Sequence, residues 1–195
     1  MYDYIKGILE ETTPTEAVVE CNGIGYKLQI SLQTFTSIQT QKEVKLFIHH
    51  HVREDIQIWY GFYSKEERSI FTSLIDVSGI GPNTARVMLS SLSCAEIKSA
   101  ITTGDVNKIK SVKGIGLKTA QKVIIDLKDK FNKAPDDLSD ILLGSQPSAN
   151  LEEALSALVM LGFNKAAADK VIKSIYKENP TYTVEQIIKF SLKLL

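Results

Sequence analysis

The first 63 residues alternate between apolar and polar positions. Short alternating runs, rich in β-branched and aromatic residues, cover 4–9, 16–21, 26–30, 44–49 and 56–62. A period of two predicts half-buried β-strands. Five short strands fit an OB-fold barrel, in which a short helix over 31–38 would join the third and fourth strands. A small β-meander is the alternative.

From residue 64 the apolar spacing changes to about 3.6 residues, which predicts helices. Ser-x-x-Glu sequences at 64–67 and 93–96 predict capping boxes at two helix starts. Pro82 suits the first turn of a helix that lies between these two starts, and Asp105 suits the N-cap of a short helix that follows the second start. In the helix expected after residue 116, three lysines should point to water: Lys118, Lys122 and Lys128.

Residues 132–150 lose this periodicity and are rich in Pro, Gly, Ser, Asn and Asp, which is typical of a flexible linker. A helix capped by Asn150 and Glu153 is expected next, followed by two more. Three helices in about 45 residues bury little apolar surface. The surface around residues 160–163 is therefore interpreted either as a docking face or as part of a self-sufficient bundle.

These patterns predict a multidomain α+β chain. Its predicted parts are an OB-fold barrel at 1–63, an all-α segment at 64–134, a linker at 135–149 and a three-helix bundle, similar in shape to ubiquitin-associated domains, at 150–195.

One nine-residue pattern occurs twice, as VSGIGPNTA at 77–85 and as VKGIGLKTA 35 residues later at 112–120. In each copy Gly-Ile-Gly joins two helical patterns, as in a helix-hairpin-helix. The glycines allow positive φ and carry no Cβ, so backbone N–H groups at a helix N-terminus can approach an anion. Such a surface contacts no base edge, and it predicts sequence-independent binding to nucleic-acid phosphates. A plain connector between packed helices is the alternative.

A third Gly-Ile-Gly, at 23–25, lies between two strand patterns and predicts a hairpin turn. The other two copies lack the third glycine of a dinucleotide fingerprint, since Thr84 and Thr119 stand there. Leu117 separates Gly116 from Lys118, so the P-loop pattern is not met either. No nucleotide site is predicted.

The net charge of zero, from 23 basic and 23 acidic residues, hides an uneven distribution. Residues 1–63 carry five basic and eight acidic side chains, whereas residues 64–134 carry twelve and seven. The positive charge therefore lies with the two hairpins, which supports phosphate binding by that segment alone.

No cofactor or metal site is predicted. Cys21 and Cys94 are too few for a disulfide framework or a zinc site. In the run 49–51 of three histidines, alternation along a strand places His50 on the opposite face from its neighbours. A cytoplasmic location is expected, because no signal peptide or bilayer-spanning apolar run is found.

The whole chain resembles the RuvA family, bacterial proteins that bind Holliday junctions. The resemblance rests on Val52-Arg53-Glu54-Asp55, Tyr60-Gly61-Phe62, Glu67-Arg68, Phe71, the two hairpins, Ala154-Leu155-Ser156-Ala157-Leu158 and Leu161-Gly162-Phe163. It implies a flat homotetramer that holds an open four-way DNA junction with eight hairpins, independently of base sequence. Whether two such tetramers associate face to face as an octamer is not decided by the sequence. The resemblance also implies a non-catalytic subunit that recruits the RuvB ATPase, works in the same complex as the RuvC resolvase, and has no membrane partner.

The resemblance assigns three groups of residues. Phosphate binding is predicted for Gly79, Gly81, Asn83, Thr84, Gly114, Gly116, Lys118, Thr119 and Lys122. Glu54 and Asp55 would form an acidic pin at the junction centre, where carboxylates repel crossing phosphates; the ordinary alternative is a solvated turn. Partner docking is predicted for Leu158, Leu161, Gly162 and Phe163.

This chain departs from the family pattern at both hairpins. Asn83 and Leu117 stand where the family often has basic residues, so phosphate contact should depend more on backbone N–H groups, with Lys118, Lys122 and Arg86 supplying charge.

Two other functions stay open. A helix-hairpin-helix DNA glycosylase or lyase would use Asp136 or Asp137 as its carboxylate, although a catalytic acid needs a rigid setting that a linker does not offer. A pure adaptor would use only the last three helices and leaves both hairpins unexplained.

Overall fold

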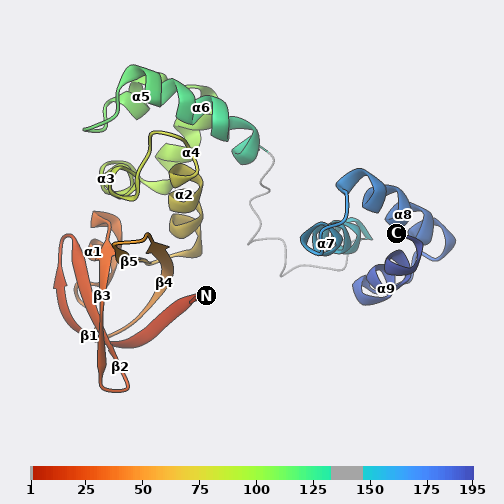
Figure 1. Cartoon of the computed structure of the whole chain (residues 1–195), viewed down its shortest axis with the longest axis horizontal. Helices are drawn as coiled ribbons and strands as arrows, with labels where there is room; N and C mark the ends of the chain where they lie inside the picture. The colour runs from red at the N-terminus through yellow and green to blue at the C-terminus, as the bar shows by residue number, and fades with distance from the viewer. Residues whose placement is uncertain (1, 133–146) are drawn as a thin grey trace. The chain divides into compact units, whose positions relative to one another are not determined.

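The computed structural model describes residues 2–132 and 147–195. It contains two compact units, 1–135 and 136–195, which are treated separately below (Figure 1). Most of the predicted linker, including Asp136 and Asp137, lies outside the described residues. Its last three residues, 147–149, belong to the helix α7, so this helix begins before the predicted cap at Asn150.

The first part of unit one is a closed five-stranded barrel. Its strands are β1 (Tyr4–Thr13), β2 (Glu16–Cys21), β3 (Ile24–Ile30), β4 (Glu43–Val52) and β5 (Gln57–Phe62). They follow the order β1-β2-β3-β5-β4, and the parallel pairing of β3 with β5 closes the barrel. This pairing confirms the OB-fold prediction and excludes a meander. The expected helix is α1 (Leu32–Ile38), which Ser31 caps.

Two hairpin turns of the barrel have simple local causes. Asn22 and Gly23 both adopt positive φ, 51° and 80°, as the predicted turn between β2 and β3 requires. At the β4–β5 turn, the Arg53 N–H donates to the Ile56 carbonyl at 2.8 Å. This leaves Glu54 and Asp55 as the two residues at the tip.

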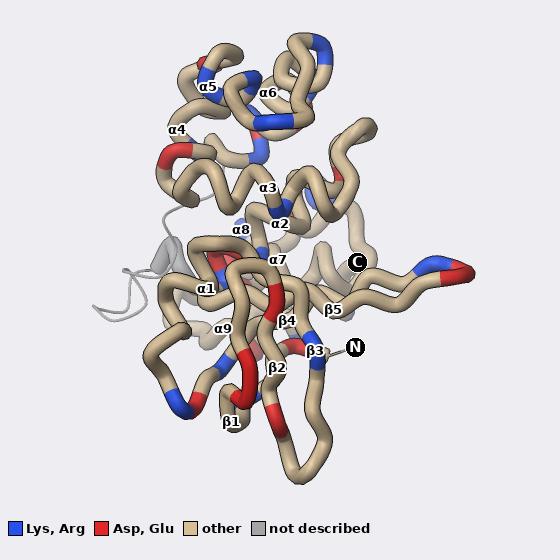
Figure 2. Tube along the Cα trace, turned by 90° about the vertical axis from the view of Figure 1, so that its left-hand side faces the viewer, with Lys and Arg blue, Asp and Glu red and all other residues tan. Residues whose placement is uncertain are grey.

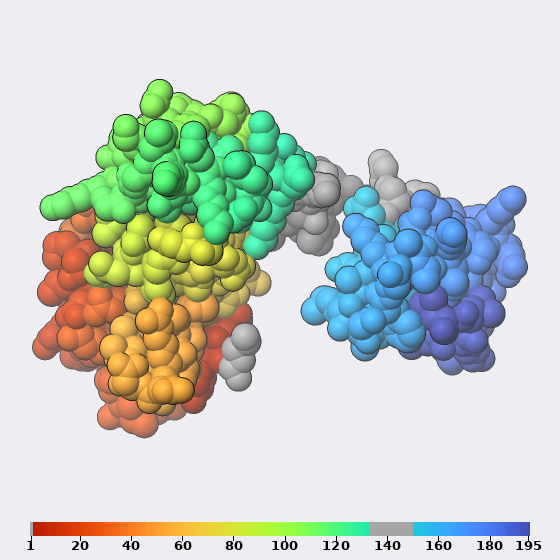
Figure 3. Space-filling view, turned by 45° about the horizontal axis from the view of Figure 1, so that its top comes forward, coloured from red at the N-terminus to blue at the C-terminus, as the bar shows by residue number. Residues whose placement is uncertain are grey.

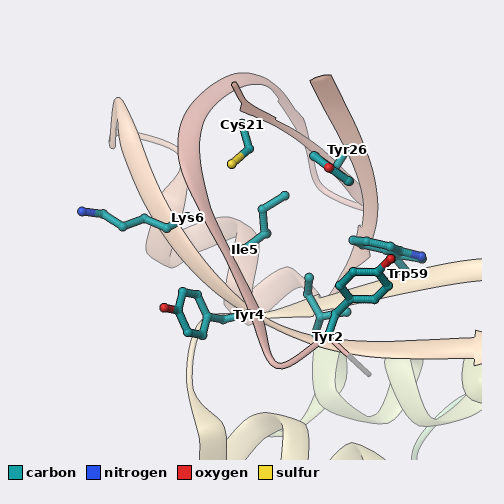
Figure 4. Close-up of a pocket in the computed structure, with 8 residues that line it drawn as sticks. Tyr2, Tyr4, Ile5, Lys6, Cys21, Tyr26 and Trp59 are labelled. Atoms are coloured by element: carbon teal, nitrogen blue, oxygen red, sulfur yellow. The ribbon is translucent and has the colours of Figure 1, made fainter. Parts of the chain in front are cut away.

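The barrel has a mostly apolar cavity of about 280 Å³ at one mouth, lined by Tyr2, Tyr4, Ile5, Lys6, Cys21, Tyr26, Ile48 and Trp59. Trp59, the chain's one tryptophan, lies between Tyr2 and Tyr26, with ring centroids 4.7 and 5.3 Å away (Figure 4). His50 also packs against Trp59, at 5.4 Å. Aromatic side chains therefore form much of the lining at this end of the barrel.

Five helices complete unit one: α2 (Lys65–Ile75), α3 (Pro82–Ser91), α4 (Cys94–Thr103), α5 (Val106–Lys110) and α6 (Leu117–Asn132). Pro82 is the first residue of α3 and Asp105 caps α5, as predicted. The box at Ser93 is confirmed, because Ser93 and Glu96 each bond the other's backbone N–H. The box at Ser64 is only half correct: Ser64 caps α2, but the Glu67 carboxylate bonds elsewhere.

In unit one α2 and α3 lie next to the barrel, with α2 against β4 and β5, and α4–α6 lie farther from it (Figure 3). One hydrophobic core contains Tyr60 and Phe62 of β5 together with apolar side chains of α2 to α6, and Phe71 of α2 packs 4.9 Å from both aromatic rings. A separate core fills the barrel interior. Because β5 contributes to the core shared with the helices, the barrel and the hairpins form one packed body.

Unit two is a bundle of α7 (Pro147–Met160), α8 (Lys165–Glu178) and α9 (Val184–Leu194). Asn164 caps α8, and a capping box of Thr183 and Gln186 starts α9. The hydrophobic core consists of small or aliphatic side chains, and Ser191 of α9 is fully buried as well: the core residues are Ala154, Leu158, Ala168, Ile172 and Ile187. Nowhere in the described ranges is a helix long and apolar enough to cross a membrane.

Candidate nucleic-acid interface

The two repeated motifs form hairpins with the same backbone conformation. Gly79 and Gly114 occupy equivalent positions and have φ of 97° and 92°. L-amino acids with a Cβ rarely adopt this left-handed region, so both positions favour glycine for the turn itself.

Each hairpin is anchored by two buried aliphatic residues. Val77 and Ile80 of the first hairpin are 2% and 4% exposed, and Val112 and Ile115 of the second are 3% and 6% exposed. The later residue of each pair donates its N–H to the carbonyl of the earlier one, at 3.0 and 3.1 Å. Only the tips of these rigid loops, which contain the glycines, face solvent.

The second glycine of each hairpin has a different role. Gly81 has φ of −86°, which any residue adopts, and Gly116 is not in the left-handed region either. A Cβ at either position would meet no described atom within 4 Å. Neither internal packing nor backbone strain therefore requires glycine here. Close approach of an external group to the backbone does explain it.

Backbone donors are present beside this open space. Gly81 is the N-cap of α3 and has no side chain to bond the first-turn N–H groups, and no capping bond is found for this helix start. Helix N-termini with unpaired N–H groups attract anions. Gly116 holds the equivalent position before α6: the Ala120 N–H donates to its carbonyl at 2.9 Å, as the Ala85 N–H donates to that of Gly81 at 3.0 Å.

The predicted side chains lie around these two loops. Thr84 and Thr119 are half-buried in the first turns of α3 and α6, while Asn83 is exposed. Lys118 and Lys122 are exposed on α6 and form no ion pair with the residues that the structure describes. Several of the basic residues of unit one lie around α5 and α6 (Figure 2).

Arg86 connects the first hairpin to the barrel through hydrogen bonds. Its Nη1 donates to the Thr15 carbonyl at 3.0 Å and to Gln29 Oε1 at 2.6 Å, and both acceptors belong to the barrel. Its Nη2 donates to Asn83 Oδ1 at 3.0 Å. These contacts join residues up to 71 positions apart in the sequence, so no local pattern could have revealed them.

Glu54 and Asp55 lie at the end of the β4–β5 hairpin, which projects from the barrel (Figure 2). Both are exposed, and neither forms an ion pair with a residue in the described ranges. Two acidic side chains at the tip of this hairpin repel any phosphate that approaches it.

Glu67 joins the barrel to the helices. Its carboxylate is 3% exposed and accepts hydrogen bonds from the Ser31 hydroxyl, from Thr34 Oγ1 at 2.7 Å and from the Tyr63 N–H at 3.2 Å. Burial raises the pKa of Glu67, and these three donors oppose that rise. The contacts connect α1, the end of β5 and α2, so they help fix the acidic hairpin relative to the first helix-hairpin-helix.

The three histidines of the run lie on two faces of β4, as alternation predicts. His49 and His51 stack on one face with centroids 6.3 Å apart, whereas His50 packs against Trp59 on the other. Desolvation by burial lowers the pKa of His49, which favours its neutral form. Within residues 2–132 and 147–195, no group of three or more metal-ligating side chains is found.

The docking prediction for unit two needs one correction. Leu158 is fully buried in the bundle core and has no surface for a partner. Leu161 is 61% exposed and follows directly after Met160, which is 86% exposed, while Phe163 is half-buried. Gly162 ends α7 with φ of 96°, and the Phe163 N–H then bonds the Leu158 carbonyl at 3.1 Å. The exposed part of the predicted face is therefore the helix end, not the helix interior.

An OB-fold barrel combined with two glycine-tipped helix-hairpin-helices defines a class of proteins that bind the DNA backbone independently of sequence.

Comparison with known proteins identifies the family within this class. Residues 1–61 match the family model "RuvA N terminal domain", 71–129 match "SAM-like Helix-hairpin-helix tandem", and 149–195 match "RuvA, C-terminal domain". Similar proteins from Christiangramia forsetii, Flavobacterium psychrophilum and Bacteroides thetaiotaomicron are 53%, 50% and 49% identical, each over the full length of both chains. All three are named "Holliday junction branch migration complex subunit RuvA". The chain belongs to the RuvA family.

Proposed function

We propose that this chain is the subunit that binds four-way DNA junctions in a Holliday junction branch migration complex. The observation that carries the proposal is the pair of hairpins whose second glycines, Gly81 and Gly116, are required by neither backbone conformation nor packing. The names of the full-length relatives support the same function.

The hairpins would hold the arms of the junction through DNA phosphates. Backbone N–H groups at the starts of α3 and α6 donate to phosphate oxygens, and the lysines of α6 add attraction that weakens as salt rises. Because these contacts read no base edge, binding is independent of sequence. We propose that the nine residues predicted from the sequence bind phosphate: Gly79, Gly81, Asn83, Thr84, Gly114, Gly116, Lys118, Thr119 and Lys122. Thr84 and Thr119 lie in the first turns of α3 and α6.

The acidic hairpin would act at the junction centre. Glu54 and Asp55 repel phosphates, and this repulsion disfavours a continuous duplex at the centre more than separated strands. The packed core shared by β5 and the helices supports this division of roles, because it holds the acidic hairpin and the basic loops in one body.

The chain itself would not catalyse a reaction. Movement of the junction requires ATP hydrolysis, which we assign to the RuvB ATPase as partner, with RuvC as a further member of the complex. Four copies around one junction would supply eight hairpins, two for each arm. The exposed end of α7, at Leu161, is the proposed contact for the ATPase.

A gel-shift comparison of four-way, forked and linear DNA, without divalent metal, tests this function. We expect the purified chain to bind the four-way junction most tightly, to leave all three DNAs intact and to hydrolyse no ATP. Equal affinity for junction and linear duplex, or cleavage of any of these DNAs, would contradict the proposal.

A further inference from the structure

Asn83 and Arg86 form a pair at the first hairpin. Arg86 Nη2 donates to Asn83 Oδ1 at 3.0 Å. A guanidinium group only donates hydrogen bonds, so the amide atom that faces it must be the oxygen. The Asn83 NH2 group, with two donors, therefore points away from Arg86. Asn83 is exposed and is the second residue of α3, next to the open space at Gly81.

Arg86 is itself held by the barrel. Gln29 Oε1 accepts from Arg86 Nη1 at 2.6 Å, and Gln29 Nε2 donates to Glu16 Oε1 at 2.7 Å. A carboxylate only accepts and a guanidinium only donates, so the orientation of the Gln29 amide is fixed as well. Lys27 also pairs with Glu16, at 2.9 Å. A directed series of hydrogen bonds thus runs from β2 through β3 to the start of α3.

The second hairpin has the same two kinds of residue in the opposite order. Thirty-five positions after Asn83 stands Lys118, and thirty-five positions after Arg86 stands Gln121. In the second hairpin the cation therefore lies in the first turn of the helix, and the neutral amide lies one turn behind it. In the first hairpin the amide lies in front and the cation behind.

We propose that Arg86 is a positioning residue, which orients the Asn83 amide so that its NH2 group donates to a DNA backbone phosphate at the first hairpin. Lys118 makes the corresponding contact directly at the second hairpin. The guanidinium behind the amide also draws electron density from it, and this strengthens the hydrogen bond to an anion. This inference rests on the proposed junction-binding function.

The test is a double-mutant cycle on junction affinity at fixed salt. Asn83→Ala and Arg86→Gln should each weaken binding about tenfold, as expected for the loss of a hydrogen bond to a charged group. The combined Asn83→Ala/Arg86→Gln variant should be no weaker than either single variant, because Asn83 contributes only when Arg86 orients it. Independent phosphate contacts would instead give additive losses, which would overturn the proposal.

A swapped variant separates orientation of Asn83 from simple bracing of the barrel. Asn83→Lys/Arg86→Gln copies the order of Lys118 and Gln121 and should restore wild-type affinity. Continued weak binding by this variant would mean that the contacts of Arg86 to the barrel matter by themselves, and the proposal would fail. Arg86→Lys keeps the charge but loses the planar fork, so it should bind as weakly as Arg86→Gln; full affinity there would also overturn the proposal.

Controls keep this result distinct from a failure of the proposed function. Gln121→Ala, at the equivalent position of the second hairpin, should leave junction affinity unchanged, and thermal unfolding of each variant reports whether it is folded. A wild-type chain without preference for junctions would contradict the function itself. A wild-type chain that prefers junctions, with Asn83→Ala and Arg86→Gln equally tight, would contradict only the role of Arg86.

Discussion

Single glycines provide the sharpest test of how the hairpins bind. Alanine at Gly81 or Gly116 fits the backbone and meets no neighbouring atom, but alanine is a poorer N-cap residue than glycine, so each variant should stay within about 1 kcal/mol of the wild type in stability. The added Cβ would keep a phosphate from the backbone N–H groups. Junction affinity should fall roughly 10- to 100-fold, as expected for lost hydrogen bonds to a charged group. Gel shifts combined with urea unfolding measure both effects.

Gly25→Ala is the matched control for this prediction. Its Cβ would lie at ordinary contact distance, 3.4 Å, from Val18, and the position belongs to β3 rather than to a helix-hairpin-helix. It should not change junction affinity. Gly79 and Gly114 are poorer tests, because alanine at their positive φ costs about 1 kcal/mol or more of stability. If Gly81→Ala and Gly116→Ala bind junctions as tightly as the wild type, the hairpins only connect packed helices and do not bind phosphate.

The stability of the barrel–helix contact should depend on Glu67. Removing the carboxylate in Glu67→Ala leaves the buried donors of Ser31, Thr34 and Tyr63 without their acceptor, and should cost about 3 kcal/mol or more of unfolding free energy. Glu66→Gln is the matched control. Glu66 is an exposed neighbour whose ion pair with Lys98 should contribute less than about 1 kcal/mol. Equal losses in the two variants would show that the buried contacts of Glu67 do not hold the barrel and helices together.

The free energy of unfolding should also depend on pH through Glu67. Its pKa in the folded chain is raised above the ordinary value of 4.5, so the folded state binds the proton more tightly than the unfolded state does. The contribution of Glu67 to stability therefore increases as pH falls through the raised pKa and levels off below about 4.5. The difference in unfolding free energy between wild type and Glu67→Gln, measured from pH 7 to pH 4, should follow this curve. A difference independent of pH would contradict it.

At the level of the β4–β5 hairpin, charge should decide which DNA is bound. Glu54→Gln/Asp55→Asn removes two negative charges and leaves the helix-hairpin-helices unchanged. Affinity for linear duplex should rise roughly 10- to 30-fold relative to the junction, since each of the two charges repels a nearby phosphate by about 1 kcal/mol in water. The measurement is the ratio of the two affinities at fixed salt.

Glu10→Gln/Glu11→Gln provides the comparison for the acidic hairpin, because it removes the same charge from exposed positions of β1. An equal shift in both double variants would indicate a general effect of net charge. No shift in either would leave Glu54 and Asp55 as ordinary residues of a solvated turn.

At the level of the whole chain, the two compact units should separate two functions. A fragment of residues 1–132 contains the complete cores of the barrel and the hairpin helices, so it should fold and bind junctions as the full chain does. It should fail to stimulate the proposed partner, the RuvB ATPase. Branch migration assays with fragment and full chain measure this difference, and equal activity would show that residues 147–195 are not the docking unit.

Most of the fold was predictable because its signals are local. Alternation predicted the five strands, and the repeated Gly-Ile-Gly predicted both hairpins. The predicted capping box at Glu67 was wrong because its carboxylate bonds Ser31 and Thr34, which lie 36 and 33 residues earlier. The contact of Arg86 with Thr15 spans 71 residues. Side-chain contacts at such separations depend on the tertiary fold, and a single sequence carries no periodic signal for them.

The closed barrel also limits how copies of this chain can associate. A strand at the edge of an open sheet presents unpaired N–H and C=O groups, which recruit further strands and lead to aggregation. Here β3 pairs with β5 and β1 pairs with β4, so every strand of the barrel has a neighbour on both sides. Copies crowded together on DNA cannot extend one another's sheets along a complete free edge. If copies associate, we expect them to use complementary side-chain surfaces, because the barrel leaves only part of a strand edge free. Such surfaces allow a fixed number of copies, whereas sheet extension would continue without limit.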